Sequence, residues 1–357
     1  MTTAAKSTNS VTLAEAGALY TAGRGYLAAC TLGLPTIATI NAMHADTEAW
    51  ARGEACAARY CDVVERVRAG YADLVCVTPD RVAIGSQTSV LAGMVAASVP
   101  DGAEVVLPRG DFSSMVFPFL AQAHRGVTVR QVQLADLAAS LNEKTWLVAF
   151  SLVQSATGKL ADIDAIRIAA RKTGTFTLCD TTQAAGWMPV DASAFDATIC
   201  HSYKWLGAPR GVAFFTINST FAANLHPVNA GWYAGDDVWA SCYGPAMALA
   251  TDARRFDVSP AWPAWVGAEP AIDLFRSLDL AEVRDHNVAL GDALCDGLDL
   301  PRVGQAIISW PDADGRDLAR LTAAGLTASG RAGRARVAFH LFNDEEDVAL
   351  ALAALRP

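Results

Sequence analysis

Charged side chains are scarce in this sequence, and basic ones never gather in a run. They make up 18% of the 357 residues, and the formal net charge is -9. Proteins that bind nucleic acid need clustered lysine and arginine to neutralise phosphates, so we expect no nucleic-acid partner. No segment reaches the ~20 uninterrupted apolar residues of a membrane span, and the first ten residues lack the apolar stretch of a signal peptide. These absences favour a cytoplasmic protein that has no membrane partner.

Closely spaced cysteine pairs are absent as well. A structural zinc site needs ligands at short and repeated spacing, whereas these cysteines are scattered, without a CxxC pair and with mostly apolar neighbours. We therefore expect no metal site, and buried free thiols at the eight cysteines: Cys30, Cys56, Cys61, Cys76, Cys179, Cys200, Cys242 and Cys295.

Apolar content is high, at 52%, in a chain long enough for one large domain and a smaller one. Between about residues 80 and 217, short β-branched runs alternate with alanine-rich amphipathic segments. This alternation predicts an α/β fold with a mostly parallel sheet covered on both faces, and ligands at the carboxyl ends of its strands. The predicted strands are 81–84, 104–107, 127–132, 146–150, 176–179, 197–200 and 212–217, and the predicted helices among them are 88–99, 113–123 and 162–172.

The pattern changes after about residue 265. A long helix is predicted over 268–296, followed by a tail of strand, helix, strand and helix. Asn343 and the acids that follow it suit the N-terminus of the last helix, where backbone N–H groups lack partners. We expect three parts: an N-terminal segment (1–25) that packs on the small domain, a large domain (26–265) and a small α+β domain (266–357).

The candidate chemistry lies between residues 177 and 215. Asp180 closes one apolar strand, Gln183 follows it, and Lys204 comes after the next strand, in HSYKW. Burying an ammonium is costly unless it is paired, deprotonated or converted to a Schiff base. A carboxylate can keep the nitrogen of a pyridine ring protonated, as an electron sink requires. The alternative is an exposed Lys204 in a loop and an Asp180 that caps a turn.

Together with YLAACTLGLP (26–35), VQSATGK (153–159) and RVAFHLFND (336–344), these residues resemble the aminotransferase class V family of fold-type I pyridoxal-phosphate enzymes. Within that family the sequence is most similar to the kynureninase-like and hercynylcysteine sulfoxide lyase-like branch. The resemblance extends over nearly the whole chain. It implies a seven-stranded large domain with a small C-terminal domain, pyridoxal 5'-phosphate as cofactor, a small amino acid as substrate and a homodimer.

The resemblance assigns a role to each matching residue. Lys204 corresponds to the lysine that forms the Schiff base, Asp180 to the partner of the pyridinium nitrogen, and Gln183 to the residue at the ring's phenolic oxygen. Gln87 and Thr88, at the start of a predicted helix, correspond to the phosphate cradle. An ordinary helix cap would use similar residues.

His201 and Tyr203 lie on one face if the strand before Lys204 continues that far, and both are then candidates for the phosphate. Phe112 occupies the position of an aromatic ring that stacks on the cofactor. Because a phenyl ring cannot accept or donate a proton at neutral pH, proton transfer falls to Lys204. The alternatives are a structural histidine at 201 and a simple core role for Phe112.

Arg336 matches the arginine that binds the substrate carboxylate, with a surface salt bridge in the small domain as the alternative. Ser259 lies near a segment that crosses the dimer interface in relatives, and it is a suggestion only. Transamination and β-elimination with carbon-sulfur lysis are the expected reactions, with kynureninase-like hydrolysis as the runner-up. A non-catalytic relative is a further alternative. The absence of cysteine after Cys295 argues against persulfide chemistry.

Overall fold

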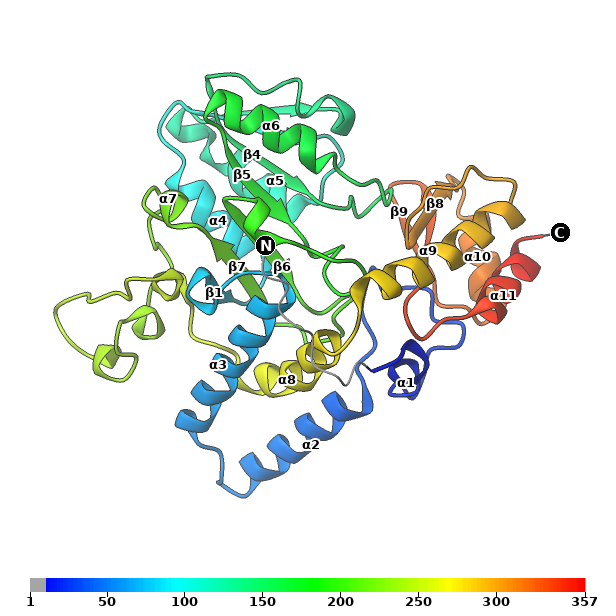
Figure 1. Ribbon diagram of the computed structural model, residues 1–357, viewed down its shortest axis with the longest axis horizontal. Helices are drawn as coiled ribbons and strands as arrows, with labels where there is room; N and C mark the ends of the chain where they lie inside the picture. The colour runs from blue at the N-terminus through cyan, green and yellow to red at the C-terminus, as the bar shows by residue number, and fades with distance from the viewer. Residues whose placement is uncertain (1–10, 357) are drawn as a thin grey trace.

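The computed structural model describes residues 11–356, and its centre is a seven-stranded sheet (Figure 1). The strand order is β1-β7-β6-β5-β4-β2-β3, and β7 alone runs antiparallel to its neighbours. The predicted α/β fold with a mostly parallel sheet is therefore confirmed. All seven predicted strands are present: β1 (Val82–Gly85), β2 (Glu104–Pro108), β3 (Thr128–Val132), β4 (Thr145–Ser151), β5 (Phe176–Asp180), β6 (Ala197–His201) and β7 (Ala213–Ile217).

Helices cover both faces of this sheet (Figure 1). Side chains alternate along each strand, so Ala83 packs into one core while Val82 and Ile84 pack into the other. One core is closed by α3 (Ala57–Leu74), α6 (Ile163–Thr173) and α8 (Trp262–Arg276), and α2 (Ile37–Ala51) packs outside on α8. The other core is closed by α4 (Thr88–Ser98), α5 (Ser113–Leu120) and α7 (Ser219–Ala222).

The prediction of one long helix over 268–296 is wrong. The structure has two helices there, α8 and α9 (Leu280–Gly297), separated at residues 277–279. The Ser277 hydroxyl donates to the Leu274 carbonyl at 2.7 Å, and the Asp279 carboxylate accepts from the Ala281 N–H at 2.9 Å. Short polar side chains that bond to nearby backbone end one helix and begin the next. The helix predicted over 113–123 likewise ends early, at Leu120, and a 3-10 turn follows.

The C-terminal part forms a separate layer at the right of Figure 1. Its three-stranded sheet has the order β8-β10-β9, and it shares a third core with α9 and two further helices. Asp344 caps the last helix in a capping box, as the acidic start of that segment predicts. The elements are β8 (Ile307–Pro311), α10 (Arg316–Ala323), β9 (Ser329–Arg331), β10 (Arg334–Ala338) and α11 (Glu345–Leu355).

The chain around residues 13–25 contacts this C-terminal layer. It contains α1 (Leu13–Gly17), and the Gly25 N–H donates to the Asp347 carboxylate at 2.6 Å. Arg24 also pairs with Asp344 at 2.8 Å. Residues 1–10 of the predicted N-terminal segment and residue 357 of the predicted small domain lie outside the described residues. The predicted boundary between the large and small domains, at residue 265, falls inside α8. The domain boundaries stay a prediction.

Across residues 11–356, none of the helices combines the length and the apolar composition that crossing a membrane requires.

Candidate active site

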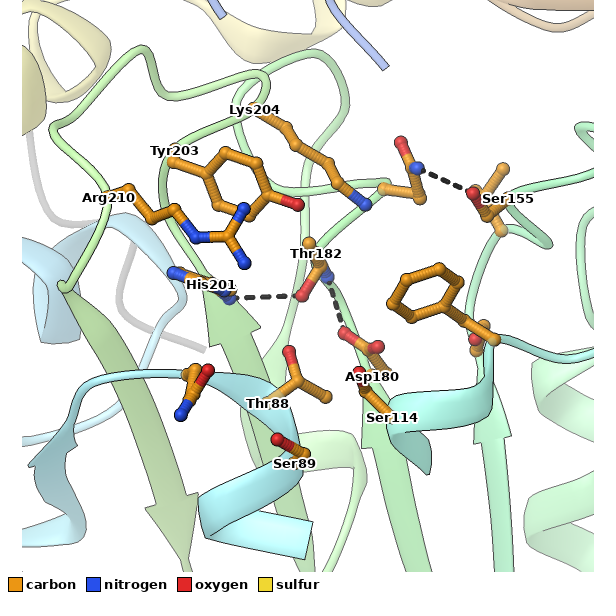
Figure 2. Close-up of a pocket in the computed structure, with 15 residues that line it drawn as sticks. Thr88, Ser89, Ser114, Ser155, Asp180, Thr182, His201, Tyr203, Lys204 and Arg210 are labelled. Carbon is orange, nitrogen blue, oxygen red and sulfur yellow. Dashed lines mark hydrogen bonds between the residues drawn. The ribbon is translucent and has the colours of Figure 1, made fainter. Parts of the chain in front are cut away.

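A cavity of about 170 Å³ opens at the carboxyl ends of β4, β5 and β6 (Figure 2). This is the edge where an open α/β sheet is expected to bind its ligand. Eight of the predicted site residues line the cavity: Gln87, Thr88, Phe112, Asp180, Gln183, His201, Tyr203 and Lys204. Residues separated by more than a hundred positions therefore meet in one place.

Lys204 and Asp180 are the two buried charged residues that line this cavity. Only 6% of Lys204 and 5% of Asp180 is exposed, so the alternative of a surface lysine is excluded. Burial lowers the pKa of Lys204 to about 8, against the opposing charge of Asp180. Burial raises the pKa of Asp180, although the Thr182 hydroxyl and N–H, the latter at 2.9 Å, and the charge of Lys204 favour its carboxylate. The site thus holds an amine poised to lose its proton in the same cavity as a buried acid.

Gln183 is fixed by three hydrogen bonds. Its Nε2 donates to the Cys30 carbonyl at 2.9 Å and to Ser155 Oγ at 3.1 Å, and its Oε1 accepts from Trp205 Nε1 at 2.9 Å. Both amide hydrogens are therefore engaged within the protein. A ring oxygen would have to replace one of these acceptors to take the hydrogen bond predicted for this position.

His201 presents a buried nitrogen without a partner. The strand β6 ends at His201, so the condition that it continue to Tyr203 is not met. Both side chains nevertheless line the cavity, and their ring centroids lie 4.3 Å apart in an edge-to-face arrangement. Among the described residues no group bonds to His201 Nε2. Burial, helped by the charges of Arg210 and Lys204, lowers the pKa of His201 to about 3. A neutral imidazole with an unpaired nitrogen suits a polar ligand in the cavity.

The N-terminus of α4, with Thr88 and Ser89, lies on the same side of the cavity as His201 (Figure 2). Gln87 is the N-cap residue, but its side chain makes no capping hydrogen bond, so it stays available. Thr88 and Ser89 follow on the first turn and line the cavity. Backbone N–H groups and the helix dipole favour an anion at this end. The cation of Arg210, which lies 5.0 Å from the centre of the Tyr203 ring, lines the cavity near this end.

Phe112 forms an aromatic wall of the cavity, with 44% of its surface exposed. The Lys204 ammonium lies 5.4 Å from the centre of its ring. This exposure excludes a simple core role for Phe112. The preceding Asp111 holds the turn in place, because its carboxylate accepts from the Ser151 N–H at 2.8 Å and from Gln154 Nε2 at 3.1 Å.

Arg336 does not itself line the cavity; it lies directly behind Ser155. It is 1% exposed and donates to Ser155 Oγ at 3.0 Å, to the Ser155 carbonyl and to Thr31 Oγ1 at 2.7 Å. No carboxylate lies within 4.0 Å of it among residues 11–356, so the alternative of a salt bridge does not hold there. Only Ser155 separates its guanidinium from the cavity, and within residues 11–356 no carboxylate pairs with that guanidinium.

Ser259 is exposed and does not line the cavity. The nearby chain is anchored by Asp257, which pairs with the buried Arg68 at 2.6 Å and accepts from the Ile84 N–H at 2.8 Å. The suggestion for Ser259 depended on a second subunit, so it stays a prediction.

Seven further residues line the cavity and were not predicted from the sequence. Two had a signal, because Ser155 stands inside VQSATGK and Thr182 stands between Asp180 and Gln183. The other five are mostly small side chains, and some lie close to predicted site residues in the sequence. They reach the cavity only because the chain folds separate segments around it. The seven are Ser89, Ser114, Ser151, Val153, Ser155, Thr182 and Arg210.

Gly33 allows the loop before α2 to lie against the lysine. Its N–H donates to the Tyr203 carbonyl at 2.9 Å, and a Cβ there would overlap the Lys204 carbonyl oxygen. We expect Gly33→Ala to lower the free energy of unfolding by about 1–3 kcal/mol, measured by urea denaturation. Gly93→Ala is the control, because a Cβ at that helical position meets no atom within 4 Å. That variant should be as stable as the wild type or slightly more stable. Equal stability of both variants would contradict the close approach of this loop to Lys204.

Comparison with known proteins identifies the family. The model of the family "Aminotransferase class-V" matches residues 37–314, which is more than half of the chain. The chain therefore belongs to the aminotransferase class-V family. Among curated proteins it is similar to a kynureninase from Deinococcus radiodurans, with 28% identity over 270 residues that cover 72% of this chain and 65% of the kynureninase. The chain thus matches somewhat less than two thirds of that relative's length.

Solved structures show the same fold. A mutant of the cystine C-S lyase C-DES, with glycine covalently linked to its PLP cofactor, has a TM-score of 0.84 at 21% identity, covering 94% of this chain and 96% of that one. The cysteine desulfurase CsdA from Escherichia coli has a TM-score of 0.83 at 16% identity, covering 97% and 98%. The predicted family, enzyme class and fold are thereby confirmed, and pyridoxal 5'-phosphate, the predicted cofactor, is the cofactor of C-DES in the first of these structures.

Proposed function

We propose that this chain is a pyridoxal 5'-phosphate-dependent enzyme that acts at the α-carbon of a small amino acid. Transamination and β-elimination with carbon-sulfur lysis are the proposed reactions. The observation that carries the proposal is the buried Lys204, with its lowered pKa, in one cavity with the buried carboxylate of Asp180. A purely structural lysine has no reason to be held in a cavity in this way.

The residues of the cavity fit the cofactor. Lys204 is the amine that would hold it covalently, and Asp180 is the carboxylate for its ring nitrogen. For the phosphate there are the first turn of α4 with Gln87 and Thr88, the unpaired Nε2 of His201, and Tyr203. When bound, this cofactor supplies an electron sink that makes the bonds at the substrate's α-carbon labile.

The chain's own residues then orient the substrate and move its proton. Lys204 Nζ is the proton carrier, because burial lowers the pKa of His201 to about 3 and so makes it a weak base, and Phe112 has no exchangeable proton. The ring of Phe112 forms a flat wall of the cavity, which favours a flat group stacked against it. Arg336 binds the substrate carboxylate by exchanging its hydrogen bonds to Ser155 and Thr31 for a bidentate pair.

Relatives of this chain include enzymes with two other reactions. Cysteine desulfurase chemistry with a cysteine nucleophile near the C-terminal arginine is disfavoured, because the chain has no cysteine after Cys295. Hydrolysis of a β-keto amino acid is the second candidate, supported by the 28% identity to a kynureninase. If the reaction is kynureninase-like hydrolysis, the enzyme should release anthranilate from L-kynurenine. The fluorescence of the released anthranilate measures this directly.

The pH dependence of cofactor uptake tests the role of Lys204. A lysine attacks an aldehyde only as the neutral amine, and the pKa of Lys204 is lowered to about 8 by its burial. The rate at which the apoprotein takes up the cofactor should therefore rise with pH up to about 8 and become constant above it, in stopped-flow absorbance at fixed cofactor concentration. An increase that continues up to pH 10 would indicate an ordinary lysine and would contradict the burial of this amine.

The decisive experiment for the proposed function is a screen of amino acids against the purified holoenzyme. We expect a visible absorbance band from the bound cofactor and a change of that band with the substrate. Products are then assayed as a keto acid for transamination, or as pyruvate and a sulfur compound for lysis. A protein that binds no cofactor, or whose band responds to no amino acid, would refute the proposal and support a non-catalytic relative.

We propose further that the enzyme is a cytoplasmic homodimer. Light scattering of the holoenzyme should give twice the 37.5 kDa mass of the chain. A monomer that retains full activity would refute this part of the proposal.

A further inference from the structure

One face of the small sheet carries three arginines next to the cavity. Arg334 stands opposite Arg331, and Arg336 stands opposite Ser329, in the antiparallel pairing of β10 with β9. Residues directly opposite in such a pair point to the same side of the sheet, as do alternate residues along a strand. Arg331, Arg334 and Arg336 therefore share one face.

This face is turned toward the loop that closes the cavity. Ser309 of β8, which stands opposite Arg336, donates its hydroxyl to the Ala156 carbonyl at 3.0 Å. Arg336 itself bonds to Ser155, and Ser155 lines the cavity. The arginine face and the cavity are thus joined by two adjacent residues of the 153–159 loop.

The three arginines differ in what they bind. Arg336 is engaged by Ser155, Thr31 and Ser329, and Arg334 donates to the Ser309 hydroxyl at 2.9 Å and to its carbonyl at 2.6 Å. Arg331 is exposed, and the one hydrogen bond found for its guanidinium within residues 11–356 goes to the adjacent Gly330 carbonyl. None of the three has a carboxylate within 4.0 Å in the described part of the chain.

The position of Arg331 is fixed by a tight turn. Ala332 and Gly333 both have positive φ, at 51° and 71°, as a two-residue hairpin turn requires, and this turn leads directly back to Arg334. Arg331 is not among the residues that line the cavity, but its charge is close enough to affect Lys204, which does line it. Burial chiefly lowers the pKa of Lys204, and the charges of Arg336 and Arg331 add to that decrease.

We propose that Arg331 is a specificity-determining residue that binds an anionic group at the end of the substrate's side chain. The preferred substrate is then an α-amino acid with a second oxyanion, a carboxylate or a sulfur oxyacid. This inference rests on the proposed function, because Arg336 is assigned to the α-carboxylate. The chain has 37 acidic and 28 basic residues, so carboxylates are available to pair with arginines. Because none pairs with this arginine face in the described residues, the face suits an anion of the substrate.

Binding to the holoenzyme tests this proposal. The probes are L-aspartate, L-glutamate and L-cysteate, compared with the neutral L-asparagine, L-glutamine and L-alanine. Dissociation constants come from the shift of the cofactor band and, independently, from calorimetry. In the wild type we expect at least one acidic probe to bind about tenfold more tightly than its neutral counterpart, as a charge-assisted pair with arginine allows. A preference for cysteate over aspartate distinguishes a sulfur oxyacid from a carboxylate.

In Arg331→Gln this preference should fall to about one, while the affinity for L-alanine is unchanged. Arg331→Lys should restore part of the preference. The matched control is Arg316→Gln, which removes an exposed arginine of the same layer that pairs with Asp314. It should retain the wild-type preference.

Each other outcome counts against the proposal in a distinct way. Equal affinity for acidic and neutral probes in the wild type, with a normal spectral response, would overturn the role of Arg331 and leave the proposed function intact. An Arg331→Gln variant that keeps the preference for acidic probes would also overturn it. The same holds if this variant changes the mass of the assembly and not the preference. A holoenzyme that responds to no amino acid would refute the proposed function itself.

Discussion

The Lys204→Ala variant is expected to lose the reducible bond to the cofactor and nearly all activity. Lys204 is one of only five lysines in the chain, and it is 6% exposed. Removing its amine removes both the covalent attachment and the proton carrier. Proton transfer by a positioned side chain is worth about 10²–10⁴-fold in rate, so kcat should fall by at least that factor. The measurement is the turnover of the best amino-acid substrate, together with the absorbance spectrum before and after borohydride.

Lys172→Ala is the control for this variant. Lys172 is exposed on α6 and does not line the cavity, so its removal should leave the spectrum and kcat unchanged. Lys204→Ala should remain folded, because it replaces a buried amine by an apolar group. If Lys204→Ala keeps the wild-type rate, another group carries the proton and the assignment of Lys204 is wrong.

The Asp180→Asn variant should have the second largest effect. The amide keeps the shape of the side chain and can still accept from the Thr182 N–H, but it has no charge to stabilise a protonated ring nitrogen. We expect kcat to fall by about 10²–10³-fold, in the range for loss of one preorganised electrostatic group. The free energy of unfolding should not fall, because an uncharged amide is easier to bury than a carboxylate.

Asp257→Asn separates this effect from the burial of a charge in general. Asp257 is also fully buried, but its carboxylate is paired with Arg68 and does not line the cavity. Breaking that pair leaves the buried Arg68 with Glu65 as its remaining carboxylate partner, so stability should fall while the cofactor band is retained. A wild-type kcat in Asp180→Asn would show that Asp180 does not act on the cofactor ring.

The sheet could be predicted from local patterns, and most of the cavity residues from the resemblance to the class V family. Strands such as β5 and β6 are short apolar runs that end in a polar residue, so Asp180 and His201 mark the sheet edge where ligands bind. The break between α8 and α9 could not be predicted in this way. Ser277 and Asp279 occur in many continuous helices, and their bonds to the local backbone decide the outcome only once the helices pack.

The remaining details of the site depend on long-range contacts. The Gln183 side chain is set by Cys30, Ser155 and Trp205, which belong to three separate segments. Arg336 was predicted from its motif, but its place behind Ser155 follows from how the small sheet docks on the 153–159 loop. Sequence patterns give residue identity and local geometry, whereas such distances come from the packing of whole elements.

Borohydride reduction of the wild-type holoenzyme, followed by peptide mass mapping, identifies the lysine that binds the cofactor. Reduction fixes the cofactor to the lysine that holds it, and the chain offers Lys6, Lys144, Lys159, Lys172 and Lys204. We expect the added mass on the peptide that contains Lys204 and on no other. Cofactor mass on a different lysine, or none on any peptide of a yellow protein, would contradict it.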